Sequence, residues 1–127
     1  YVLESRRQLV NNAFTAASGS AIGNAVAYIN IKYKEDITLN QLCEISGYSH
    51  QHFCRLFKAQ MGMRPMEYIA RRRIAQSKTL LADSELTISQ IGSDVGYPEP
   101  TYFGMVFRKY EGISPSEYRK RRNSLEI

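Results

Sequence analysis

The sequence predicts an all-α protein made of two helix-turn-helix subdomains joined by a long central helix. Three observations lead to this fold class. One segment of the chain occurs twice, apolar residues recur at helical spacing, and glycine and proline fall where helices end and begin. No segment shows the alternation of apolar and polar residues that is typical of a half-buried strand.

The repeat pairs segment 38–68 with segment 87–118. The two copies are in register at a separation of 49 residues up to Tyr48, and at 50 residues from Phe53 onward, because the second copy carries one inserted residue. Two copies indicate a pair of similar subdomains, since a solenoid needs at least three stacked repeats.

Each copy opens with a capping box, in which a threonine side chain accepts a hydrogen bond from a first-turn N–H and a glutamine reaches back. The boxes are Thr38 with Gln41, and Thr87 with Gln90. An apolar stripe follows each box, and a glycine then ends the helix because glycine tolerates a left-handed backbone. These residues are Leu39, Leu42, Ile45 and Gly47 in the first copy, and Ile88, Ile91, Val95 and Gly96 in the second.

A second helix begins after a short turn in each copy. Ser49 is a suitable N-cap in the first copy, whereas in the second Glu99 can cap and Pro100 suits the first helical position, where a missing N–H costs nothing. We expect one face of each helix to be buried and a glycine to end it. These residues are Phe53, Leu56, Phe57 and Gly62 in the first copy, and Phe103, Val106, Phe107, Tyr110 and Gly112 in the second.

Proline and apolar spacing predict the remaining helices. A central helix begins at Pro65 and is expected to run unbroken to residue 82, and a last helix begins at Pro115 after the N-cap Ser114. An opening helix is expected at 22–33. Its apolar face holds Ile22, Val26, Ile29 and Tyr33.

These elements suggest a domain organisation in which a leader precedes a double helix-turn-helix domain. We expect a leader at 1–20, the domain at 21–122 and a tail at 123–127, with the first unit at 21–64, the connecting helix at 65–82 and the second unit at 83–122. The leader ends in small residues including glycine and serine, and the chain begins with Tyr1 rather than methionine. We therefore expect the leader to be a linker from a missing N-terminal domain.

The net charge of +5 and the pI of about 9.3 favour a polyanionic partner, with nucleic acid first. No long apolar run is present, so no transmembrane helix is expected, and no signal peptide opens the chain. We expect a cytoplasmic protein that does not engage a membrane. Cys43 and Cys54 are then expected to be reduced thiols.

The second helix of a helix-turn-helix lies in the major groove, where its N-terminal part contacts base edges. In the first unit, the candidates for base contact are Gln51, Cys54 and Arg55, which face away from the buried phenylalanines, and His50, which lies near the helix start. Arg55 is the strongest candidate, because the paired donors of its planar guanidinium match O6 and N7 of guanine. Gln51 suits adenine. In the second unit the candidates are Thr101, Tyr102 and Met105, which offer less base specificity.

Polar and basic groups that flank both units are candidates for phosphate contact, which positions a protein without recognising sequence. They are His52, Lys58, Arg64, Arg72, Arg108, Lys109 and Arg119, with Arg71, Arg73 and 120–122 as further basic positions. Released counterions would make DNA affinity strongly dependent on salt. The same charge runs also fit solvated helix faces, and 119–122 equally suits an anionic membrane surface.

The sequence carries no strong sign of a metal site or of catalysis. His50 and Cys54 share a helix face, but His50 and His52 do not, and a structural zinc site needs four ligands. No glycine-rich phosphate loop, paired catalytic carboxylates or Ser/His/Asp constellation emerges. We expect no metal, no cofactor and no catalytic residue.

Many of these positions together form a recognisable pattern. It comprises Gly47-Tyr48-Ser49, Phe53, Arg55-Leu56-Phe57-Lys58, Gly62, Pro65, Tyr68, Gly96-Tyr97, Phe103, Phe107-Arg108, Gly112 and Ser114-Pro115. Over about residues 22–122 the chain resembles the AraC/XylS family of bacterial transcription regulators. Met105 departs from the family, in which a polar or basic residue is frequent at this position.

The resemblance implies a fold of about seven helices, with one recognition helix in each subdomain. It also implies binding to double-stranded promoter DNA, contact with RNA polymerase, and a separate sensor or receiver domain. Transcription activation is the expected effect, with repression as the alternative. The fragment is expected to be monomeric, and a homodimer formed through the missing part is the expectation for the full-length protein.

Sequence-specific DNA binding is the leading hypothesis. Two recognition helices on one rigid body should meet successive turns of the major groove about 34 Å apart, so that one domain covers an asymmetric site. The alternative from another class is an all-helical protein-interaction adaptor with incidental basic charge. Nonspecific nucleic-acid binding is a third hypothesis.

Overall fold

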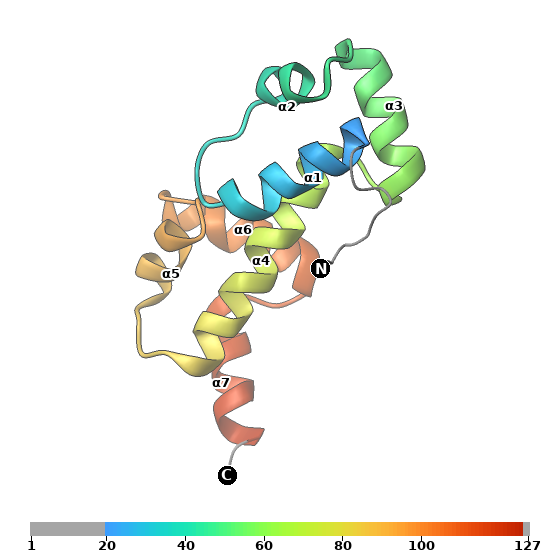
Figure 1. Ribbon diagram of the computed structural model, residues 1–127. Helices are drawn as coiled ribbons and strands as arrows, with labels where there is room; N and C mark the ends of the chain where they lie inside the picture. The colour runs from blue at the N-terminus through green and yellow to red at the C-terminus, as the bar shows by residue number, and fades with distance from the viewer. Residues whose placement is uncertain (1–19, 126–127) are drawn as a thin grey trace. The chain divides into compact units, whose positions relative to one another are not determined.

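The computed structural model describes residues 20–125, and this part of the chain forms seven α-helices and no strand (Figure 1). The helices are α1 (Ala21–Lys32), α2 (Leu39–Ser46), α3 (His50–Met61), α4 (Pro65–Asp83), α5 (Ile88–Asp94), α6 (Pro100–Glu111) and α7 (Pro115–Leu125). The predicted all-α fold is confirmed. None of these seven helices is long and apolar enough to cross a bilayer. The expected leader lies outside the described residues except for Ser20.

The described residues form two compact units. The first holds α1, α2, α3 and the start of α4 as far as Tyr68. The second holds the short segment Tyr33–Asp36, the rest of α4 from Ile69, and α5 to α7. The boundary therefore falls inside α4, whose bounds of Pro65–Asp83 exceed the predicted connecting helix by one residue.

The core of the first unit forms where α1 packs against α2 and α3. α1 contributes Ile22, Ala25 and Ile29, and α3 contributes Phe53 and Phe57, all of them almost fully buried. The ring centroids of the two phenylalanines are 5.6 Å apart. Spacings of three, four and seven residues place these side chains on one face of each helix, which leaves the opposite face to solvent.

Several of the apolar residues predicted to face the core are only partly buried. Val26 is half-buried, because Ala25 takes the position on α1 that faces the core. Leu56 is also half-buried, and Ile45 at the end of α2 remains 38% exposed. An apolar stripe spans more than 100° of a helix, so the packing of neighbouring helices decides which of its edges is covered.

The core of the second unit includes the middle and end of α4. Its buried residues are Ile74, Leu81, Ile91, Val95, Tyr97, Phe103, Val106 and Phe107. Buried among them, Ser77 satisfies its hydroxyl by donating to the carbonyl of Ile74 at 2.7 Å. α4 is therefore a core element of the second unit as well as a connection between the two units.

Both predicted capping boxes are present. The Thr38 hydroxyl accepts from the backbone N–H of Gln41 at 3.1 Å, and the Gln41 side chain accepts from the N–H of Thr38 at 2.9 Å. Thr87 and Gln90 repeat this arrangement at 3.0 and 2.8 Å. These reciprocal bonds fix the starts of α2 and α5 through residues three positions apart, which is why the local sequence predicts them.

The end of α5 requires a glycine at position 96. Gly96 has φ of 109°, its N–H donates to the carbonyl of Ser93, and the N–H of Tyr97 donates to the carbonyl of Gly92 at 2.7 Å. This pair of bonds satisfies two carbonyls in the last turn of the helix, those of Gly92 and Ser93. After this turn the chain reaches Glu99, the N-cap of α6.

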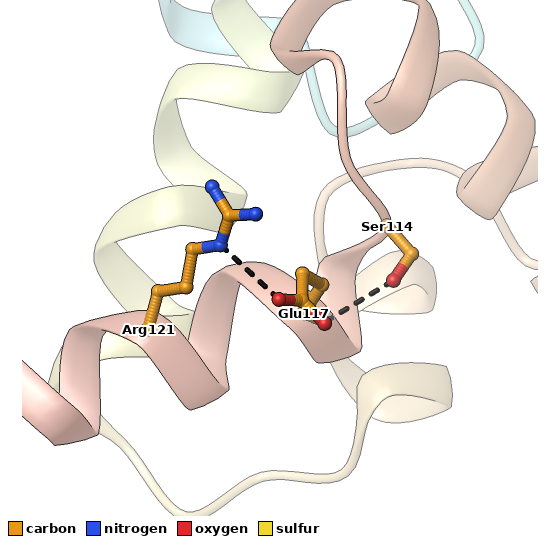
Figure 2. A network of polar contacts seen from close by, with 3 residues as sticks. All are labelled: Ser114, Glu117 and Arg121. Atoms are coloured by element: carbon orange, nitrogen blue, oxygen red, sulfur yellow. Dashed lines mark hydrogen bonds and ion pairs between the residues drawn. The ribbon is translucent and has the colours of Figure 1, made fainter.

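The start of α7 shows a polar network (Figure 2). The Ser114 hydroxyl accepts from the backbone N–H of Glu117 at 3.1 Å, as an N-cap does. The Glu117 carboxylate accepts from Nε of Arg121 at 3.1 Å, one turn along the helix. α7 continues to Leu125, so it includes part of the tail that the sequence predicts at 123–127.

Candidate nucleic-acid interface

α3 has two chemically distinct faces. Phe53 and Phe57 are fully buried. Gln51 and Arg55 face away from them, and His50 lies at the start of the helix; all three are exposed. Lys58, also exposed, continues this face toward the end of the helix, and Cys54 beside it is half-buried. The structure therefore brings together the residues that the sequence predicts on the exposed face of α3.

The start of α3 is held by contacts from the turn and from α2. The Ser49 hydroxyl accepts from the N–H of His52 at 3.3 Å, which caps the helix. Nε2 of His50 is hydrogen-bonded to Oδ1 of Asn40 on α2. The cap fixes the start of α3, and the contact between His50 and Asn40 fixes its first turn relative to α2.

Arg55 is hydrogen-bonded within α3. Its NH2 donates to Nδ1 of His52 at 2.9 Å, and the ring of His52 meets the ring of Tyr48 edge-on, with centroids 4.7 Å apart. His52, which the sequence places among phosphate contacts, is thus a neighbour of the leading base-contact candidate. Residues three apart on a helix are neighbours, so the sequence allows this pairing. The sequence alone did not indicate that the Arg55 side chain turns toward His52.

α6 presents a different surface. Thr101 is exposed, and the exposed fractions of Tyr102 and Met105 are 51% and 62%. Glu99 caps the helix by accepting from the N–H of Tyr102 at 2.8 Å. The first two turns of α6 carry no basic side chain; Arg108 and Lys109 lie in its last turn. This helix therefore offers mainly apolar and hydroxyl groups, as the sequence predicts.

The predicted phosphate contacts fall into two groups. Lys58, Arg64 and Arg108 are exposed and form no ion pair within residues 20–125. Lys109 is also exposed, with Nζ 5.4 Å from the ring centroid of Tyr110. Arg72, in contrast, lies over the ring of Tyr33 at 4.6 Å. The first group is chemically the more accessible to an external anion.

Arg119 has a role that the sequence did not reveal. Its Nε donates to the carbonyl of Leu81 at 3.0 Å, its NH1 to that of Leu86 at 2.7 Å, and its NH2 to that of Ser84 at 3.1 Å. The residue accordingly satisfies carbonyls at and just beyond the end of α4. The three hydrogen bonds give Arg119 a structural role. A contact between Arg119 and phosphate stays a prediction.

The two thiols differ in environment. Both are free; Cys43 is buried and Cys54 is half-buried. Burial raises the pKa of the Cys43 thiol, and the nearby Cys54 raises it further. No group of three or more potential metal-ligating side chains occurs in the part of the chain that the structure describes.

The capped helix pairs, their short turns and the exposed polar face of α3 define a DNA-binding domain of the helix-turn-helix class. A family model described as a helix-turn-helix domain matches residues 42–121. The lactose operon transcription activator of Staphylococcus xylosus is 36% identical over 98 residues, which are 77% of this chain and 35% of that protein. The arabinose operon regulatory protein of Salmonella typhimurium is 30% identical over 125 residues, 93% of this chain and 42% of that protein.

Solved structures share the fold. The C-terminal domain of AraT, a response regulator from Geobacillus stearothermophilus, is 29% identical with a TM-score of 0.76, and the match covers 80% of this chain and 84% of that domain. The DNA-binding domain of AdpA, solved in complex with a target DNA, has a TM-score of 0.78 at 23% identity, covering 83% of this chain and 95% of that one.

The chain belongs to the AraC/XylS family of helix-turn-helix transcription regulators. It spans 33% to 35% of the length of several curated relatives. The predicted resemblance is therefore confirmed for the DNA-binding domain.

Proposed function

We propose that the chain binds promoter DNA sequence-specifically, with α3 and α6 each entering the major groove. The observation that carries this proposal is the division of α3 into a buried phenylalanine face and an exposed face with Gln51, Arg55 and Lys58. In a helix-turn-helix protein, the exposed N-terminal half of the second helix is the part that contacts base edges.

The side chains on each helix suggest which bases they contact. Arg55 is the leading contact, because its fork of donors matches O6 and N7 of guanine, and Gln51 suits N6 and N7 of adenine. His50 and Cys54 flank these two residues on α3. On α6, Thr101, Tyr102 and Met105 favour apolar contact with thymine methyl groups and a smaller share of the specificity.

The exposed basic residues are proposed to bind phosphate. Lys58, Arg64, Arg108 and Lys109 are the strongest candidates because they are exposed. His52, Arg72 and Arg119 are retained as weaker candidates, since each already contacts another residue of the protein. Each phosphate neutralised steepens the fall of affinity with salt by about one unit of logarithmic slope.

The test is a selection from random duplex DNA, run in parallel with the wild type and with Arg55→Ala. We expect a motif of two parts about one helical turn apart, in which one part loses its preference in the variant. Lys58→Ala, on the same face of α3, is the matched control. It should weaken binding to all sequences and lower the salt slope by about 1. The absence of any motif at low salt contradicts the proposal and leaves the adaptor function.

We further propose that the chain is the DNA-binding part of a longer cytoplasmic regulator that carries a sensor or receiver domain and activates transcription through RNA polymerase. The greater length of the relatives supports a longer protein. The name of the lactose operon transcription activator supports activation, and that of the response regulator AraT supports a receiver domain. The proposal assigns the chain no catalytic step. Transcription in vitro from a promoter carrying the selected site, with purified polymerase and the longer protein, tests it. An unchanged transcript level contradicts activation.

Oligomeric state forms a separate part of the proposal. We propose that the chain alone is monomeric and that the longer protein forms a homodimer through its other domain. Sedimentation of both proteins tests this. A dimer of the isolated chain, or a monomeric longer protein, contradicts it.

A further inference from the structure

We propose that His52 is a specificity-determining residue because it positions Arg55 for base contact, through the hydrogen bond from Arg55 to its Nδ1. This inference rests on the proposed function, in which Arg55 contacts guanine. It assigns to His52 a part in base recognition that does not depend on contact between His52 and DNA.

The contact itself fixes the chemistry of the pair. NH2 of Arg55 lies 2.9 Å from Nδ1 of His52 on the same helix. A guanidinium has only donors, so Nδ1 must accept, and the proton of the neutral imidazole is then on Nε2. The direction of the bond is therefore from Arg55 to His52.

His52 is better fixed than Arg55. Its backbone N–H is bound by the Ser49 hydroxyl at 3.3 Å, and its ring lies edge-on against the ring of Tyr48. Tyr48 is half-buried, whereas Arg55 is exposed. A free arginine side chain samples many rotamers, and part of this rotamer entropy is lost when DNA binds. A hydrogen bond that already holds the guanidinium reduces this loss.

The bond leaves Arg55 able to recognise guanine. A guanidinium has two edges with paired donors, one formed by Nε and NH2 and the other by NH1 and NH2. NH2 carries two hydrogens, one on each edge, and the bond to His52 occupies one of them. The other edge keeps both of its donors for O6 and N7 of guanine. The contact with His52 therefore selects which edge faces the base.

The second unit provides an internal comparison. Tyr102 occupies the position that corresponds to His52, and its ring meets the ring of Tyr97 with centroids 5.6 Å apart. Met105 occupies the position of Arg55. The contact between aromatic rings is thus present in both units, but only the first unit has a ring nitrogen three residues before a guanidinium. Aromatic packing alone does not account for a histidine at position 52.

The experiment compares His52→Phe and His52→Asn in the 127-residue chain. Phenylalanine keeps a ring against Tyr48 but has no acceptor, whereas asparagine places an acceptor oxygen on the same carbon that carries Nδ1 in histidine. Binding is measured to the duplex selected by the wild type and to duplexes changed at single positions. We expect His52→Phe to lower discrimination at the position that depends on Arg55 by about fivefold, as for the loss of one hydrogen bond. His52→Asn should restore most of it.

Combining these substitutions with Arg55→Ala separates positioning from direct contact. Once Arg55 is absent, His52→Phe should cause no further loss of discrimination at that position. The inference is overturned if His52→Phe leaves discrimination unchanged, weakens all duplexes equally, or acts as strongly without Arg55. It is also overturned if asparagine is no better than phenylalanine. A wild type without any preferred sequence overturns the proposed function itself, whereas a loss caused by Arg55→Ala but not by His52→Phe overturns only this inference.

Discussion

Nε of Arg73 donates to the backbone carbonyl of Tyr33 at 2.6 Å, immediately beyond the end of α1. NH2 of Arg73 donates to the carbonyl of Glu35 at 2.8 Å, and the guanidinium lies 4.9 Å from the ring centroid of Tyr97. Burial raises the pKa of the Tyr97 hydroxyl, and Arg73 partly opposes this shift. One side chain on α4 thus holds the segment Tyr33–Asp36 within the second unit.

Arg73→Lys is expected to lower the free energy of unfolding by about 2 kcal/mol, because an ammonium group does not reproduce the planar fork that binds two carbonyls and stacks on a ring. Urea denaturation measures the change. Arg72→Lys is the matched control on the same helix, since a lysine also interacts with the face of Tyr33, and it should change stability by less than about 0.5 kcal/mol. Equal effects of the two substitutions contradict the role assigned to Arg73.

Arg119→Lys is expected to lower the free energy of unfolding by about 1–3 kcal/mol, because one ammonium does not replace three donors to the carbonyls beyond α4. The salt slope of DNA binding should change little. Lys120→Ala, an exposed neighbour, is the control and should leave stability within about 0.5 kcal/mol of the wild type. An Arg119→Lys variant as stable as the wild type contradicts this structural role.

Gly92→Ala is expected to destabilise the second unit by about 1–3 kcal/mol through overpacking. A Cβ at this position lies 2.8 Å from Cδ2 of the fully buried Phe103 ring, which has little room to move. Gly104→Ala is the control, since a Cβ there meets nothing within 4 Å, and helix propensity favours alanine by about 1 kcal/mol. Thermal unfolding of both variants measures the difference. A Gly92→Ala protein as stable as the wild type contradicts the close approach of α5 and α6.

Alkylation should distinguish the two thiols. Iodoacetamide is expected to modify the half-buried Cys54 before Cys43, because Cys43 is buried and its raised pKa lowers its thiolate fraction at neutral pH. Duplex DNA carrying the selected site should slow the modification of Cys54. Mass spectrometry of the modified peptides, with an unrelated duplex as the control, measures both rates. Modification of Cys54 at the same rate with and without the selected site contradicts its position at the base-contacting face.

The sequence by itself determined the helix ends and the faces of the recognition helix. Thr38 and Gln41 cap α2 through bonds between residues three apart, and the phenylalanines of α3 recur at helical spacing. Such features depend on neighbours within one or two turns, and these are visible in a local pattern. The repeat extended the same prediction to the second unit.

Only the tertiary structure decided which groups Arg73 and Arg119 bind. Arg73 bonds carbonyls 38 and 40 residues away, and Arg119 bonds carbonyls 33 to 38 residues away. From the sequence alone, neither arginine can be distinguished from the basic residues beside it. Folding brought the free carbonyls beyond α1 and α4 within reach of these two side chains, and a carbonyl left unpaired at a helix end is a strong acceptor whichever part of the chain supplies the donor.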